Sequence, residues 1–575
     1  MLRSPFAFIV ALAATSTACT GTNSPSDANA GDAASHDAPT DGSLSDAGDV
    51  PNVPIDASPP PPHGSYFEPV AMPTPMTVPT DPDPPLLAGM INGTLSRVGT
   101  SEYHEFFIVD GRLRTIGSNR AGEMGIGDAT PAVYVDARDV AVPSDARFVE
   151  VAAGGYQSIA VDSTGRVWSW GNDIWGARGD GSVADPTLAA MSRYPARDGM
   201  PVQLTLDAAG TNFGGPSDRV VQVASTLWYN AALTTSGGVY VWGFNGDDHA
   251  GSDSRGIVGD GQPVSTVMCL AEEQGPSPCH VRWPTRVTFP SGVVIRRFAA
   301  SSSMLVAIDT NGSLWTWGGG GGNGFGLGAG DRGAAGTQSS TPLQLMQGRD
   351  HEDGPLVALP HFVDATSNTN TNYAIDEAGD LWGWGIAGPA LGLGTGTWNP
   401  QGYPVKLTRS GNANYSGLDA QLTAGRRIRS VQVSLNSAHA LLDDGSLWGW
   451  GDAAMGEVGD GHIVNYLSVM PDGSGHNNVR DAWDWGGTRA TVQHAVRVLT
   501  HVRSFATSAF SFHVMAIRED GTIYSWGRNA NGVLGNHLDP LDRSQPYLAR
   551  FAPFGADPYT PNILDVPVPT WVQPF

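Results

Sequence analysis

Short apolar segments alternate with Gly-rich turns along most of the chain, and the same order of segments recurs seven times. The fullest copy, residues 158–171 (SIAVDSTGRVWSWG), has an apolar run, a turn at Gly165 and a second run ending in Trp-x-Trp-Gly. Alternation with period two places both aromatic side chains of that ending on one face of a strand. No long stretch carries apolar residues at helical spacing, so the pattern predicts many short strands.

The Trp-bearing ending recurs once in each copy, although the first copy is degenerate and ends in Arg114-Thr115-Ile116-Gly117. Large rings at these positions are expected to fill the wedge between neighbouring repeats. The positions that we predict to be structural are Trp168, Trp170, Gly171, Trp242, Gly243, Trp315, Trp317, Gly318, Trp382, Trp384, Gly385, Trp448, Trp450, Gly451, Trp526 and Gly527.

Each copy also has a strand rich in small residues before the hairpin and an extended, often Pro-started segment after it, which gives four strands. A repeated unit of this kind cannot bury its apolar face alone, so the copies must stack. We therefore predict an all-β fold, a seven-bladed β-propeller of four-stranded blades over residues 85–560, with a C-terminal tail at 561–575. Insertions are expected on one face, often the binding face, and lie at 180–218, 244–285, 329–341 and 462–492.

The order of these segments resembles the repeats of the regulator of chromosome condensation family. The resemblance rests on the small-residue strand, the Gly-turn hairpin, Trp-x-Trp-Gly, an Asn/Gly loop and the Pro-started strand, and it covers residues 85–560. It implies a seven-bladed propeller and activities such as nucleotide exchange on a small GTPase, ubiquitin-ligase scaffolding or secreted inhibition of β-lactamases. The His that follows the first strand's Gly in this family has partial counterparts at Tyr156-Gln157-Ser158 and Ala438-His439-Ala440.

The N-terminus has the pattern of an export signal over residues 1–18, with Arg3 before an apolar run at 5–14. Ser16-Thr17-Ala18-Cys19 resembles the lipobox of bacterial lipoproteins, which implies lipidation of Cys19 and an outer-membrane or cell-surface location. Ordinary cleaved secretion, to the periplasm or outside, and an uncleaved segment are the alternatives. Residues 19–63 are rich in Asp, Ala, Ser and Pro without Lys or Arg, so we expect a disordered tether.

Cysteine usage agrees with export, because only Cys269 and Cys279 accompany Cys19. In an oxidising compartment these two residues are expected to form a local disulfide across the segment between them. His280 is the only further metal ligand close by in sequence, so a metal site is not predicted there.

Charge and motifs narrow the chemistry. The formal net charge is −24, which argues against a nucleic-acid partner because phosphate binding needs clustered Lys and Arg. No P-loop, G-x-S-x-G or H-E-x-x-H motif occurs, and we predict no cofactor and no catalytic residue. The acidic segments 245–253 and 351–353 lack the spacing of a calcium loop and are interpreted as solvated turns rather than metal sites.

Several aromatic residues fall outside the repeat frame and are candidates for a binding surface, since aromatics are enriched in interaction hot spots. They are Trp175, Trp228, Tyr229, Trp398, Trp483 and Trp485. Packing of the insertions against the propeller rim is the alternative role. We hypothesise a non-enzymatic, monomeric module that binds a protein or polysaccharide of the cell envelope through loops on one face. An envelope hydrolase or lyase with carboxylates at the propeller mouth, and a purely architectural envelope protein, are the rival hypotheses.

Overall fold

The computed structural model divides the chain into two units, residues 1–63 and residues 64–575, and the described residues belong to the second. Residues 98–571 are described except 102, 129, 131, 174, 183–198, 247–255, 262–279, 320–324, 331–337, 369–370, 386–400, 435–436, 453–455, 460–490, 509–510, 520–522, 529–532 and 535–564. The predicted signal segment, the tether and Cys19 lie outside the described residues.

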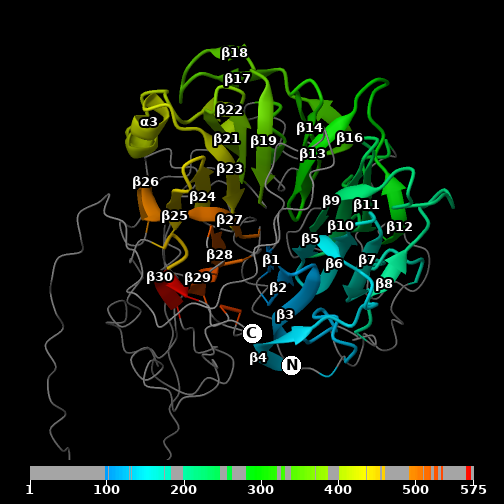
Figure 1. Ribbon diagram of the computed structural model, residues 1–575. Helices are drawn as coiled ribbons and strands as arrows, with labels where there is room; N and C mark the ends of the chain where they lie inside the picture. Colours follow the sequence, from blue (N-terminus) through cyan, green and yellow to red (C-terminus); the bar gives the residue numbers. More distant parts are fainter. Residues whose placement is uncertain are drawn as a thin grey trace, which may run out of the picture. The chain divides into compact units, whose positions relative to one another are not determined.

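The predicted seven-bladed β-propeller is confirmed. Seven antiparallel sheets follow one another in chain order, and each contains four consecutive blade strands (Figure 1). Blades 1 to 3 consist of β1 (Val98–Thr100), β2 (His104–Val109), β3 (Arg112–Ser118), β4 (Val133–Asp139); β5 (Phe148–Ala153), β6 (Gln157–Asp162), β7 (Val167–Gly171), β8 (Val202–Leu204); and β9 (Val220–Ser225), β10 (Tyr229–Thr234), β11 (Val239–Phe244), β12 (His280–Arg286).

Blades 4 to 7 repeat this plan. They consist of β13 (Ile295–Ala300), β14 (Met304–Asp309), β15 (Leu314–Gly318), β16 (Ser339–Gln344); β19 (Phe362–Ser367), β20 (Thr371–Asp376), β21 (Leu381–Gly385), β22 (Gln401–Lys406); β23 (Ile428–Val433), β24 (Ser437–Leu442), β25 (Leu447–Asp452), β26 (Thr491–Leu499); and β27 (Val502–Ala506), β28 (His513–Arg518), β29 (Ile523–Arg528), β30 (Asp565–Trp571).

Blade 5 is extended by a hairpin of β17 (Gln347–Arg349) and β18 (Leu356–Ala358), because β17 pairs in parallel with β22. Helical structure among the described residues is short. It comprises η2 (Phe325–Leu327), η4 (Ala413–Tyr415) and α3 (Ser416–Thr423), the last two on the connection from blade 5 to blade 6. The sequence therefore predicted the four-stranded repeat but not this added hairpin.

The first strand of each blade lies at the centre of the ring. β1 contacts β5 and β27, and in the same way β9 contacts β5 and β13, while β19 contacts β13 and β23. The first strands of blades 2 to 7 each contain a register shift at the second residue, such as between Phe148 and Glu150. A bulge of this kind turns the next side chain towards the neighbouring blade.

The predicted Trp frame forms the contact between blades. The second Trp of each ending is fully buried, and its indole N–H donates to a carbonyl oxygen of the preceding blade in five cases. The donors and acceptors are Trp170 to Glu123 (2.8 Å), Trp242 to Ala177 (2.9 Å), Trp317 to Ile257 (2.9 Å), Trp384 to Gly326 (2.9 Å) and Trp526 to Glu457 (3.1 Å). Trp450 donates to the Tyr373 hydroxyl at 3.3 Å instead. The structure thus confirms the role of these rings as wedge fillers.

The ring closes without strand exchange, because blade 1 and blade 7 each use four strands of their own. The C-terminal residues predicted as a tail instead supply the outer strand of blade 7, where β30 pairs with β29. A long connection, residues 529–564, separates the two strands, which is why the sequence pattern appeared to end at residue 560.

The loop glycine behind each indole gives the first prediction. A Cβ on Gly125 would lie 2.6 Å from the Trp170 indole nitrogen, and the residue has a φ of +68°. We expect Gly125→Ala to destabilise by about 1–2 kcal/mol through its backbone and by a further ~1–3 kcal/mol through overpacking. Gly292→Ala is the matched control, since its φ is +87° and nothing lies within 4 Å of its Cβ position. Equal losses in urea unfolding of the two variants would disprove a tight glycine–indole contact.

Candidate interaction face and polar centre

The order of strands defines two faces of the ring. In an antiparallel blade, the turn between the first two strands and the connection between the last two leave at the same end. We call this end the loop face, and the opposite end, which carries the second hairpin turn and the link to the next blade, the hairpin face. The insertions at 244–285, 329–341 and 462–492 extend third-to-fourth connections and so reach the loop face. The insertion at 180–218 contains β8 and therefore contributes to both faces, contrary to the prediction.

The aromatic residues predicted to form a binding surface differ in exposure. Tyr229 is fully buried in β10, and its hydroxyl donates to the carbonyls of Ser301 and Met304 in blade 4, so its assignment to a surface was wrong. Trp175 is only 6% exposed, so it too lies beneath the surface, whereas Trp228 is partly exposed. Trp398, Trp483 and Trp485, like Cys269 and Cys279, lie outside the described residues.

Trp175 and Trp228 nevertheless meet on the loop face. The Trp175 ring lies 6.5 Å from Trp228, 4.6 Å from Phe244 and 5.1 Å from His280, measured between ring centroids. Phe244 is the last residue of β11 and His280 is the first residue of β12. Both are far from Trp175 in the sequence, so no local pattern indicated that their rings would lie close to it. On the hairpin face, the apolar side chain of Met346 is 65% exposed.

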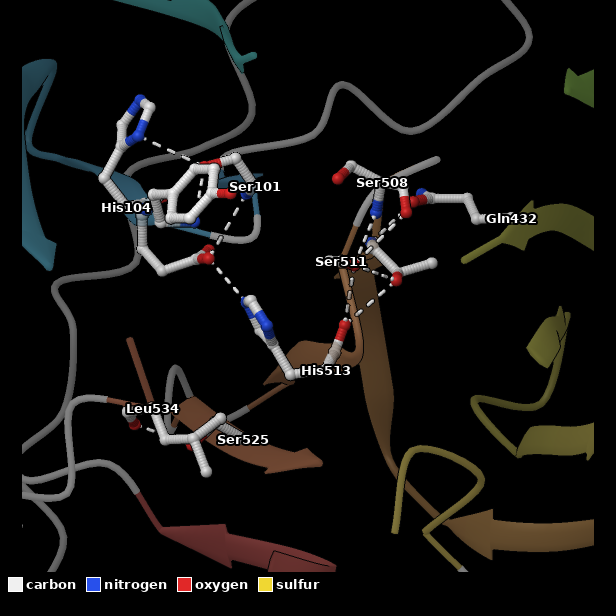
Figure 2. A network of polar contacts seen from close by, with 11 residues as sticks. Ser101, His104, Gln432, Ser508, Ser511, His513, Ser525 and Leu534 are labelled. Atoms are coloured by element: carbon white, nitrogen blue, oxygen red, sulfur yellow. Dashed lines mark hydrogen bonds and ion pairs between the residues drawn. The ribbon is translucent and has the colours of Figure 1, made fainter. Parts of the chain in front are cut away.

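Histidines that the sequence analysis overlooked lie at the closing junction between blades 7 and 1. His104 and His513 begin the second strands of their blades, where they pair with Gly117 and with its counterpart Gly527. The Nε2 atom of His513 lies 2.5 Å from Glu105 Oε1, and the Ser101 N–H also donates to that oxygen. Figure 2 shows His513 facing the strand of Ser101 and His104 across this junction.

The network continues on both sides of the junction. The Nδ1 and Nε2 atoms of His104 lie 3.1 Å from the Ser101 hydroxyl and 2.8 Å from the Ser158 hydroxyl of blade 2. Gln432 of blade 6 links to blade 7 by donating to the Phe505 carbonyl and accepting from the Thr507 N–H. Blades 6, 7, 1 and 2 are thus joined by buried polar side chains in addition to apolar contacts.

Burial controls the titration of the closing pair. It raises the pKa of Glu105 well above its usual value against the opposing effect of the Ser101 N–H, and it lowers the pKa of His513 to about 3, aided by Arg528. The pKa of His104 is likewise lowered to about 3 by burial. With these directions, the contact between His513 and Glu105 holds a single proton at neutral pH.

A pH optimum for the closing pair is the second prediction. The lowered pKa of His513 means that stability is lost as the pH falls below 6.5, its unfolded value, and the raised pKa of Glu105 means that stability is lost as the pH rises above 4.5. Between pH 4.5 and 6.5 the stability gained through one group as the pH changes offsets the stability lost through the other. The pair should therefore contribute most to the unfolding free energy in this range. Unfolding free energies from pH 3.5 to 8.5 should differ most in that window between the wild type and the double variant Glu105→Gln/His513→Gln. A difference that is constant with pH would contradict this account.

A second set of polar side chains occupies the third position of the first strands, directly after the bulge. Gln222 shows the structural role of this position, because it donates to the Phe298 carbonyl at 2.6 Å and accepts from the Phe298 N–H at 3.2 Å. Arg297 forms an ion pair with Asp364 of the next blade. The position is occupied in chain order by Glu150, Gln222, Arg297, Asp364, Ser430 and Ser504.

The carboxylates at the centre bear on the rival enzyme hypothesis. Burial raises the pKa of Glu150 to about 8 and raises that of Asp364, while Arg297 opposes both shifts. Arg297 therefore connects carboxylates from blades 2 and 5 across the ring. Asp364 is occupied in joining blades 4, 5 and 6, since it pairs with Arg297 and accepts a backbone hydrogen bond from Val431. Blade linkage thus accounts for Asp364 without a catalytic role.

The Glu150 carboxyl gives the third prediction. Its pKa is raised from 4.5 to about 8, so its contribution to stability is complete below pH 4.5 and is lost as the pH rises through 8. Replacement Glu150→Gln places in blade 2 the amide that blade 3 uses at Gln222. The unfolding free energy of Glu150→Gln, measured relative to that of the wild type, should rise by roughly 2–4 kcal/mol between pH 4.5 and 8.5. Gln222→Glu is the reciprocal control and should introduce a cost that grows over the same range.

Other polar groups show no arrangement for metal chemistry. Within the described part of the chain, no three His, Cys, Asp or Glu side chains are grouped to hold a metal ion. His351 contacts the neighbouring Asp350 in an exposed turn, in agreement with its interpretation as solvated, whereas residues 247–253 lie outside the described residues. None of the described helices is long and apolar enough to cross a membrane.

These features define the class of the protein as a seven-bladed β-propeller of four-stranded blades. The family model of the regulator of chromosome condensation (RCC1) repeat matches residues 148–173 and 511–533. The mouse regulator of chromosome condensation is 23% identical over 75% of this chain and 83% of its own length. The fission yeast protein pim1 is 23% identical over 76% and 69%. The chain thus carries regulator of chromosome condensation repeats and is similar to proteins of that family over about three quarters of its length.

Solved structures agree on the fold. The crystal structure of Prp20p from Saccharomyces cerevisiae superposes with a TM-score of 0.54 and 21% identity, covering 84% of this chain and 88% of that one. Human WBSCR16 gives a TM-score of 0.50 and 16% identity, covering 72% and 85%. At this level of identity, the superpositions establish a shared fold.

Proposed function

We propose that this protein is an exported, membrane-anchored module that binds a protein partner through the loop face. The carrying observation is that long connections between the third and fourth strands begin and end at this face, among them 172–201 in blade 2 and 245–279 in blade 3. The opposite hairpin turns are short, for example at 163–166. Loops held on a rigid scaffold are where binding residues concentrate.

Relatives support a protein rather than a small molecule as the partner. Prp20p was crystallised in a study of its binding to Gsp1p and histones, and it was also solved with Kap60 bound to it. Gsp1p, histones and Kap60 are partners of the yeast protein, and the partner proposed for the exported protein is a different one. The net charge of −24 favours a partner with a basic surface, because complementary charge speeds encounter and fixes orientation.

Site-specific photo-crosslinking in the native cells tests the face, and this is the fourth prediction. A benzoylphenylalanine at Arg120 or Asp128, both exposed on the loop face, should crosslink one protein species. The same group at Asp145 or Asp353, both exposed on the hairpin face, should not. Crosslinks confined to the hairpin face would refute the assignment.

Export is tested separately in the same cells. Cys19→Ser should move the protein from the membrane to the soluble fraction while the crosslinking pattern of the folded propeller stays the same. A protein that remains in the cytoplasm would refute the proposed location without bearing on the binding face.

A further inference from the structure

Four rings on the loop face form a cluster that the blade framework does not use. We call Trp175, Trp228, Phe244 and His280 the blade 3 aromatic cluster. Trp175 follows β7, Trp228 lies in the turn between β9 and β10, and Phe244 and His280 flank the connection between β11 and β12. Trp175 and Phe244 are buried and form the base, while Trp228 and His280 are partly exposed. The cluster therefore presents ring surface at the face that carries the long connections.

Among the residues that the structure describes, the polar atoms of this cluster have no hydrogen-bond partner. Trp228 Nε1, His280 Nδ1, His280 Nε2 and the neighbouring Asn245 Oδ1 are all buried and make no hydrogen bond. Buried polar atoms are normally paired, so three unpaired ones within the cluster, and a fourth on the residue that follows Phe244, call for an explanation. The framework rings differ, because nine of their ten indole N–H groups donate a hydrogen bond, Trp168 being the exception.

The types of these atoms define the ligand class. Trp228 offers a donor, Asn245 an acceptor, and the neutral His280 imidazole one of each. Burial lowers the pKa of His280 to about 4, aided by Arg282, so the imidazole stays neutral. A hydroxyl group is both donor and acceptor and matches this set, whereas a carboxylate could use only the donors and an ammonium only the acceptors. The cluster itself has no carboxylate to attract a cation, and Arg282 would oppose one.

We propose that the blade 3 aromatic cluster binds pyranose rings of a neutral polysaccharide. The apolar face of one sugar ring lies against Trp228, and hydroxyl groups of the adjoining sugar ring, beside the edge of the indole, hydrogen-bond to Trp228 Nε1, Asn245 Oδ1 and His280. This site is independent of the protein partner proposed above, so either proposal can fail without the other.

Isothermal titration calorimetry of the full chain with cellotetraose and with chitotetraose tests the proposal, as the fifth prediction. We expect saturable binding of at least one of these neutral tetrasaccharides. Trp228→Phe keeps a ring but loses the N–H, and should weaken binding by about fivefold. His280→Leu should weaken it by a similar factor, while His280→Gln, which retains a donor and an acceptor, should restore it.

Trp283→Ala is the matched control, because Trp283 is 37% exposed on β12 of the same blade but outside the cluster. It should leave the affinity unchanged, and thermal unfolding of each variant verifies its fold. Absence of binding to both tetrasaccharides by the folded wild type overturns the proposal. Binding of tetramethylammonium in their place, or affinity lost in Trp283→Ala but kept in both Trp228→Phe and His280→Leu, overturns it as well.

Discussion

The hydrogen bond from an indole N–H to the preceding blade is the contact on which the ring depends. This Trp residue has two roles: the indole ring fills the wedge between two sheets, and its N–H donates a hydrogen bond to a carbonyl in the loop of the neighbouring blade. The loop glycine beside it, such as Gly125, gives the close approach that the flat ring requires. Five of the seven junctions are therefore made of one residue from a strand and a short stretch of loop, a requirement that a repeated sequence can meet independently in each copy.

The junction between blades 7 and 1 is built differently, and the reason lies in the degenerate first copy. Ile116 occupies the place of the Trp and packs with Met515, Ile517 and Ile523 of blade 7. The buried contact between His513 and Glu105 supplies the polar link that the indole provides elsewhere. Among the described strands, none crosses this junction, since blades 1 and 7 each contain four strands of their own. A titratable pair thus replaces a non-titratable donor at the one place where the two ends of the repeat array meet.

The sequence predicted those features that each repeat carries within itself. Trp170 and its counterparts, the hairpin glycines and the count of seven blades follow from local patterns of spacing. The features it missed depend on partners distant in sequence: His513 and Glu105 are 408 residues apart, and Gln222 reaches a backbone 76 residues away. Tyr229 was misassigned for the same reason, because its burial depends on the carbonyls of blade 4. The outer strand of blade 7 was missed because residues 529–564 interrupt the repeat before it.

The position of the indole acceptors also explains how one face can vary while the ring is preserved. Glu123, Ala177 and Glu457 each lie six residues after the glycine of the Trp-bearing ending, so the first part of the loop is fixed by the next blade. After the acceptor residue, the connection only has to return to the fourth strand of its own blade, so the number of residues in this second part can vary. Blades 3 and 4 depart from this spacing, since their acceptors Ile257 and Gly326 come 14 residues after Gly243 and 8 residues after Gly318. Blade 3 therefore has additional residues between Phe244 and the acceptor Ile257 as well as after that acceptor. Residues inserted there lengthen a connection of the loop face without altering the contact that holds the blades together.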